Sequence, residues 1–213
     1  EGSNGSFSPV LGAVKALWGF GGETRVPAQG EIASVRAHAV LSALTLDADA
    51  HTASLAESAL LDLGAAAKGY AADMVLEKLR TDGVEHALVD LGGSISVCGT
   101  RADGEKWRVG VANPRGDGYI AVLSIADTAL STSGDYQQYF FGADGVRYCH
   151  ILDPKTGAPA CSGVVAVTVA YKSAFLADML STALFVLGPE DGTALLAKYP
   201  GAEALFLTED GYA

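Results

Sequence analysis

The feature that most constrains this 213-residue chain is a nearly uncharged helical segment, AFLADMLSTALFVL, over residues 174–187. Asp178 is its only charged residue, and a helix that is apolar on almost every side is expected to be buried. An ionised carboxylate buried without a partner would be strongly unfavourable, so a cation or a set of hydrogen bonds must compensate it. Ser181 and Thr182 follow at helical spacing and share its face.

Asp178, Ser181 and Thr182 have two interpretations. Carboxylate and hydroxyl oxygens are hard ligands that suit Mg²⁺, with a backbone carbonyl and a ligand phosphate completing the coordination. The alternative is structural, with Asp178 capping a loop or pairing with an arginine. The residues alone leave both interpretations open.

A second informative segment is DLGAAAKGYAAD, residues 62–73. Apolar residues at helical spacing predict a helix over 66–80, which the sequence TDG ends. Its first turn would hold Lys68 beside free backbone N–H groups, which favours an anion such as a phosphate. The lysine precedes the second glycine, so this is not a P-loop. Alternatively, Asp62 caps the helix and Lys68 lies in solvent.

The remaining pattern predicts an α+β fold with one mostly antiparallel sheet and helices packed on it. Further helices are expected over 11–20 and between Pro27 and Ala43, followed by a pair of short strands within 44–64. Glycine-containing turns join most of the later strands, which favours antiparallel pairing. The expected strand segments are EHALVDL, SISVCG, WRVGVANP, YIAVLSI, YQQYFF, VRYCHILD and VVAVTVAY.

Composition excludes several classes of protein. The formal charge of −11 opposes binding to nucleic acid, and no apolar run approaches the roughly 18 residues of a membrane span. We therefore expect a soluble, globular chain. Cys98, Cys149 and Cys161 include no C-x-x-C pair, which gives neither a zinc site nor a disulfide framework. Serine-hydrolase and dinucleotide-binding motifs are not found.

His150 opens the segment HILDPKTGAP at the end of an expected strand. A histidine on a rigid element just before a turn is well placed for catalysis. The alternative is a histidine packed within the strand. LVDLGGSIS and LSTSGDYQQYF also place small hydrogen-bonding residues beside strands.

Taken together, DLGAAAKGYAAD, LVDLGG, STSGDYQQYF, HILDPKTG and ADMLSTALFVLG occur in an order and spacing that resemble the ApbE family of FAD:protein FMN transferases. The resemblance covers about residues 5–210 and implies an ApbE-like architecture related to the T-fold. It implies one catalytic domain over residues 1–213 that lacks the family's N-terminal portion.

The resemblance also implies an activity: Mg²⁺-dependent transfer of FMN from FAD to a threonine or serine hydroxyl of a target protein, with release of AMP. His150 is similar to the family's general base. Asp62, Lys68 and the carbonyl of Leu152 resemble its FAD contacts. The metal would be held by four residues of this chain, namely the Ala65 carbonyl, Asp178, Ser181 and Thr182, with Ser181 standing where some members carry a second acid.

The partners implied are FAD and an acceptor subunit of a redox complex. The family is typically extracytoplasmic, in the periplasm or as a cell-surface lipoprotein, so membrane association would come only through an anchor absent from this chain. Two other functions stay open. One is a Mg²⁺-dependent FAD pyrophosphatase giving FMN and AMP, and the other is a non-catalytic flavin-binding module.

Overall fold

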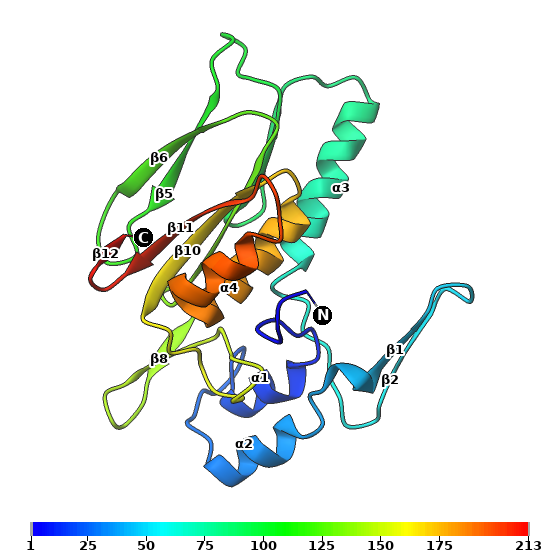
Figure 1. The fold of residues 1–213 in the computed structure, drawn as a ribbon, viewed down its shortest axis with the longest axis vertical. Helices are drawn as coiled ribbons and strands as arrows, with labels where there is room; N and C mark the ends of the chain where they lie inside the picture. The colour runs from blue at the N-terminus through cyan, green and yellow to red at the C-terminus, as the bar shows by residue number, and fades with distance from the viewer. Residues whose placement is uncertain (1, 213) are drawn as a thin grey trace. The chain divides into compact units, whose positions relative to one another are not determined.

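The computed structural model describes residues 2–212 and confirms the predicted α+β class. The chain divides into two compact units. One comprises the part up to Leu63 together with Asp135–Cys161, and the other comprises Gly64–Gly134 together with the part from Ser162 onward. Figure 1 shows the elements of both units. Within residues 2–212, no helix combines the length and the apolar character that a membrane crossing requires.

The unit that contains Gly64–Gly134 is built on a six-stranded sheet with the order β12-β11-β10-β7-β4-β3. Every neighbouring pair in it is antiparallel, as the glycine turns predicted. A separate hairpin, β5–β6, belongs to the same unit. The strands of this unit are β3 (Ala87–Asp90), β4 (Ser94–Cys98), β5 (Trp107–Ala112), β6 (Tyr119–Ile125), β7 (Ala129–Gly134), β10 (Val164–Tyr171), β11 (Glu203–Thr208) and β12 (Gly211–Tyr212).

The central strand β7 corrects the sequence-based assignment, which had no strand at ALSTSG. β7 pairs with β10 on one side and with β4 on the other. One of its faces carries Leu130, which packs with Val97, Val109 and Ile125 in a core formed with the β5–β6 hairpin. Because side chains alternate along a strand, Ser131 and Ser133 lie on the opposite face.

Two helices cover that opposite face. α3 (Ala67–Thr81) matches the helix predicted over 66–80 to within one residue. α4 (Ala174–Leu196) contacts β10, β7 and β11, and Figure 1 shows it lying along the sheet. The helical segment expected over 174–187 does not end there: Gly188 has non-helical backbone angles that kink the helix, which then resumes to Leu196. Proline tolerates the first position of a helical segment, so the chain can restart there.

The beginnings of α3 and α4 stabilise each other. Asp73 of α3 accepts hydrogen bonds from the amides of Ala174 and Phe175 at 2.8 and 3.0 Å, at the start of α4. In return, Asp178 of α4 accepts the amide of Gly69, near the start of α3, at 3.1 Å. Each helix therefore supplies a carboxylate to the positive end of the other, where unsatisfied N–H groups favour an anion.

Gly69 permits this arrangement because the two helices touch at that residue. A Cβ placed on Gly69 would lie 2.2 Å from the carbonyl oxygen of Ala174. The obstacle is backbone, which cannot rotate away. Hence the glycine within AAAKGY is required by helix packing.

We expect Gly69→Ala to destabilise the protein by about 1–3 kcal/mol, since an added methyl group must push the helices apart. Gly30→Ala is the matched control, because Gly30 also lies in a helix, α2 (Gln29–Arg36), but has open space around its missing Cβ. That substitution should be neutral or stabilising. Urea unfolding of both variants measures the difference, and equal stabilities would contradict the packing role of Gly69.

The other unit contains shorter elements. They are α1 (Gly12–Trp18), α2, the 3-10 turn η1 (Leu41–Ala43), β1 (Leu44–Asp47), β2 (Thr52–Leu55), β8 (Tyr139–Phe141) and β9 (Arg147–Cys149). β1 pairs with β2 as predicted, and β8 pairs with β9. The single helix expected between Pro27 and Ala43 is wrong in extent. Val40 has extended backbone angles, which separate α2 from η1.

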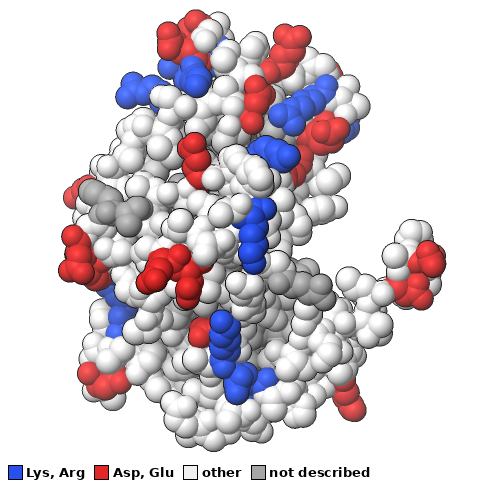
Figure 2. Space-filling view, viewed as in Figure 1, with Lys and Arg blue, Asp and Glu red and all other residues white. Residues whose placement is uncertain are grey.

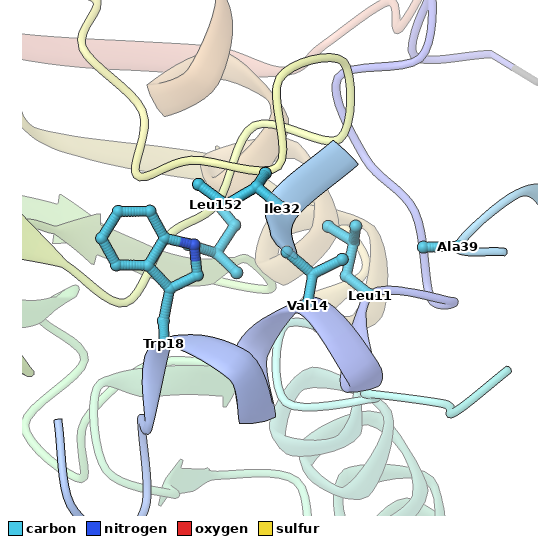
Figure 3. Close-up of a cluster of buried hydrophobic side chains, with 6 residues drawn as sticks. All are labelled: Leu11, Val14, Trp18, Ile32, Ala39 and Leu152. Atoms are coloured by element: carbon cyan, nitrogen blue, oxygen red, sulfur yellow. The ribbon is translucent and has the colours of Figure 1, made fainter. Parts of the chain in front are cut away.

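The core of this unit joins segments that are distant in the sequence. Figure 3 shows Trp18 of α1 beside Leu152, with other buried apolar side chains around them. The Trp18 indole N–H donates to the carbonyl oxygen of Gly157 at 2.8 Å. The segment HILDPKTG is therefore anchored to α1 both by packing and by a buried hydrogen bond.

The three cysteines are all free thiols, and they differ in accessibility. Cys98 and Cys149 are buried, whereas Cys161 is exposed. Burial raises the pKa of the Cys149 thiol to about 11, so very little of it is thiolate at pH 8. We expect iodoacetamide at pH 8 to label Cys161 alone in the folded protein and all three cysteines after denaturation. Peptide mass spectrometry measures this, and rapid native labelling of Cys149 would contradict its placement.

Candidate metal and phosphate site

Asp178 is almost completely buried, and donors from two elements hold its carboxylate. Oδ2 accepts the amide of Gly69 in α3. Oδ1 accepts the hydroxyl of Ser131 in β7 at 3.0 Å and lies 3.5 Å from the Lys68 ammonium. The buried negative charge of Asp178 is therefore compensated by two hydrogen bonds and a nearby cation together. Asp178 thereby also has a structural role, because it accepts an amide in the first turn of α3.

Ser181 and Thr182 continue the same face of α4, and both contact β7. The Ser133 hydroxyl lies 2.8 Å from that of Ser181 and 3.1 Å from that of Thr182. Ser181 also donates to the main-chain carbonyl of Asp178 at 2.9 Å. A carboxylate and two hydroxyls thus lie along one helix face, with two serines of a neighbouring strand behind them.

The chemistry of these donors fits Mg²⁺, which prefers oxygen ligands and is usually held by one or two carboxylates with the rest of its shell supplied by water or phosphate. Among the described residues, His, Cys, Asp and Glu side chains do not gather in groups of three or more suited to a metal ion. A metal at Asp178 would therefore need hydroxyl or carbonyl oxygens as additional ligands. Thr182, four residues after Asp178 in α4, carries such a hydroxyl.

Lys68 lies in the first turn of α3, as predicted. Its side chain is 44% exposed, and its ammonium donates to the carbonyl oxygen of Gly64 at 3.1 Å as well as approaching Asp178. Ala65, whose carbonyl is the predicted metal ligand, lies in the turn just before this helix. Lys68 is therefore exposed to solvent, as the alternative expected, and it also contacts Asp178.

Asp62, a predicted FAD contact, belongs to the other unit. Its carboxylate forms an ion pair with Lys15 of α1 at 2.8 Å, and its amide donates to the carbonyl of Pro9. The alternative expected Asp62 to cap α3. In the structure, Asp178 of α4 accepts the amide of Gly69 in the first turn of α3. The role of Asp62 in FAD binding stays a prediction.

His150 immediately follows β9 and is partly exposed. Its Nδ1 lies 3.2 Å from the carbonyl oxygen of Gln138, and its ring meets that of Phe20 edge-on at 6.4 Å between centroids. Because a carbonyl oxygen can only accept, Nδ1 carries the proton in the neutral imidazole. Nε2 is then the nitrogen with the lone pair, which is the form that a general base needs.

Leu152 is buried in the core around Trp18, and it forms an isolated antiparallel bridge with Pro159. Between them, Asp153 organises a tight turn. Its side chain accepts the amide of Lys155 and its carbonyl accepts that of Gly157, both at 2.8 Å. The predicted flavin contact at the Leu152 carbonyl would therefore come from a rigid backbone.

The residues that sequence analysis missed lie mainly on β7 and on the neighbouring strand β4. Ser131 and Ser133 both face the candidate metal ligands, and Ser94 of β4 donates to the Ser131 hydroxyl at 3.4 Å. The signal was present in ALSTSG, where every second residue is small or hydroxylic. That composition is more typical of a turn than of a central strand.

Comparisons with known proteins agree with this architecture. The model of the ApbE family matches residues 1–206. The crystal structure of an ApbE protein from Thermotoga maritima is similar over 99% of this chain and 70% of its own, with a TM-score of 0.90 and 37% identity. The flavin transferase ApbE from Vibrio cholerae is similar over 100% of this chain and 69% of its own, with a TM-score of 0.86 and 35% identity.

Two curated relatives carry the name FAD:protein FMN transferase. The one from Treponema pallidum is 39% identical over 99% of this chain, and the one from Vibrio cholerae is 37% identical over 99%. The chain spans 62% and 64%, respectively, of the lengths of these relatives. With a family model that matches almost all of its length, the chain belongs to the ApbE family.

Proposed function

We propose that this chain carries out the metal-dependent chemistry of an FAD:protein FMN transferase, moving FMN from FAD to a threonine or serine hydroxyl of a target protein. The observation that carries the proposal is the buried Asp178 carboxylate, fixed by Gly69 and Ser131 and followed by Thr182 on the same helix face. The curated relatives bear the name of this activity.

Asp178, Thr182 and the Ala65 carbonyl are the residues proposed to hold Mg²⁺, with Ser181 as a further predicted ligand. Bound there, Mg²⁺ would neutralise charge on the diphosphate of FAD. Lys68, in the first turn of α3, contributes a second positive charge beside the helix start. Phosphoryl transfer depends mainly on positioning and charge neutralisation, which this set of residues supplies.

The proposed reaction breaks one phosphorus–oxygen bond and forms another. The acceptor hydroxyl oxygen attacks the phosphorus of the FMN half, and AMP leaves with the electron pair of the broken bond. His150 takes the hydroxyl proton at Nε2, in the tautomer that the Gln138 carbonyl favours. Asp62 and the Leu152 carbonyl are proposed to contact FAD.

The proposed acceptor is a subunit of a redox complex, and the proposed location is extracytoplasmic. Nucleic acid is not a proposed partner. On the face shown in Figure 2, lysine and arginine side chains lie among acidic ones, and the net charge of −11 opposes binding to a phosphate backbone.

The test is to incubate the protein with FAD, Mg²⁺ and a threonine-containing acceptor peptide, and to measure peptide mass and free AMP. The proposal predicts a peptide heavier by one FMN moiety and an equal amount of AMP. FMN and AMP formed without peptide labelling would indicate the pyrophosphatase instead. FAD binding with neither product would indicate a flavin-binding module.

A further inference from the structure

We propose that Ser131 and Ser133 of β7 are positioning residues that orient the two principal metal ligands, Asp178 and Thr182. This inference rests on the proposed metal site and adds the residues that set its geometry. Both serines lie on the sheet face that packs against α4, and Ser131 is 1% exposed and Ser133 8% exposed. A hydroxyl buried on a central strand needs a partner, and each of these has one on α4.

The hydroxyl protons near Asp178 can be assigned one by one. Ser94 donates to the Ser131 oxygen, and Ser131 donates to Asp178 Oδ1. A serine has one proton to give, so that of Ser131 is committed to the carboxylate. Gly69 donates to Oδ2, and the Lys68 ammonium also lies 3.5 Å from Oδ1. The carboxylate therefore cannot rotate freely, and its remaining lone pairs keep a fixed direction.

The hydrogen bonds of Ser181 and Ser133 determine the direction of the Thr182 hydroxyl. Ser181 gives its proton to the main-chain carbonyl of Asp178, so the hydrogen bond between Ser181 and Ser133 must be donated by Ser133. Ser133 can then only accept from Thr182. The Thr182 proton consequently points toward β7, and both lone pairs of its Oγ1 stay available to a cation.

Thr132 provides a matched control within the same strand. It lies between the two serines, and the alternation of β7 directs it to the other face of the sheet. There its hydroxyl lies 2.8 Å from that of Thr168. Thr132→Val removes a hydroxyl–hydroxyl hydrogen bond on the same strand, at a residue that is less buried than the two serines and faces away from α4.

The experiment measures Mn²⁺ affinity by electron paramagnetic resonance, without FAD, for wild type, Ser131→Ala, Ser133→Ala and Thr132→Val. Mn²⁺ is a suitable probe because it shares the preference of Mg²⁺ for oxygen ligands. Each serine variant should bind about 10- to 100-fold more weakly, the usual effect of losing a residue that orients a metal ligand. Thr132→Val should bind like wild type. In EDTA, the Tm of all three variants should fall by similar amounts.

Two further variants, Ser133→Thr and Asp178→Asn, distinguish a failure of this inference from a failure of the metal site. Ser133→Thr retains a hydroxyl and should restore affinity, which a purely steric role would not predict. Serine variants that bind Mn²⁺ as tightly as wild type, or a Thr132→Val variant that weakens binding equally, would overturn this inference alone. A wild-type protein that binds no Mn²⁺, or an Asp178→Asn variant that binds it normally, would overturn the metal site and this inference with it.

Discussion

Asp178→Asn is expected to lower the rate of FMN transfer by about 10³-fold or more, because a bound divalent ion contributes several kcal/mol to the stabilisation of charge in such reactions. Asparagine keeps an oxygen that can accept the Gly69 amide, and its NH₂ group can donate to Ser131. The fold should therefore survive while the negative charge that attracts the metal is lost. Initial rates of peptide labelling, measured below the Tm of the variant, give the ratio.

Asp73→Asn is the matched control for this substitution. Asp73 occupies the reciprocal position in the helix pair, accepting the amides of Ala174 and Phe175 and the hydroxyl of Ser173 at 2.8 to 3.0 Å. Its loss should lower the Tm but leave the transfer rate largely intact below that temperature. If both variants lose activity in proportion to stability, Asp178 has only the structural role of a helix cap.

His150→Ala is expected to lower kcat for FMN transfer by about 10²- to 10⁴-fold, the usual contribution of a general base. The KM for FAD should change little, because the proton is removed only as the hydroxyl attacks. Transfer rates of wild type and variant, measured over a range of FAD concentrations, separate the effect on kcat from the effect on KM.

His86→Ala is the control for a histidine with a local structural role, since His86 Nδ1 accepts the amide of Thr100 at 3.2 Å. We expect its kcat and its KM for FAD to match those of wild type. A His150→Ala variant with wild-type kcat would remove His150 from the mechanism. The assignment of Asp178 would be unaffected by that result.

The sequence predicted the elements with strong periodicity and missed those that depend on distant partners. α3 was located to within one residue because its apolar spacing and its TDG stop are local signals. β7 was missed because serine and threonine favour turns unless their hydroxyl groups find hydrogen-bond partners inside the fold. The partners that do so, Asp178 and Ser181, lie 47 and 48 residues further along the chain.

In the candidate site too, the local features were predictable from the sequence and the distant partners were not. A lone acid in an apolar helix implied a compensating partner, and the structure supplies one in α3. The identity of that partner was not predictable, since Gly69 and Asp178 are 109 residues apart and the donor is a main-chain amide. The need for glycine at position 69 likewise comes from the backbone of another helix, so no local pattern encodes it.

The most direct measurement is an anomalous difference map from crystals of the protein soaked in Mn²⁺. The account predicts a peak about 2.0–2.2 Å from an Asp178 carboxylate oxygen, with the Thr182 hydroxyl and the Ala65 carbonyl also as ligands. Clear Mn²⁺ peaks only at other positions, with the Asp178 carboxylate still bound to Gly69 and Ser131 alone, would contradict it.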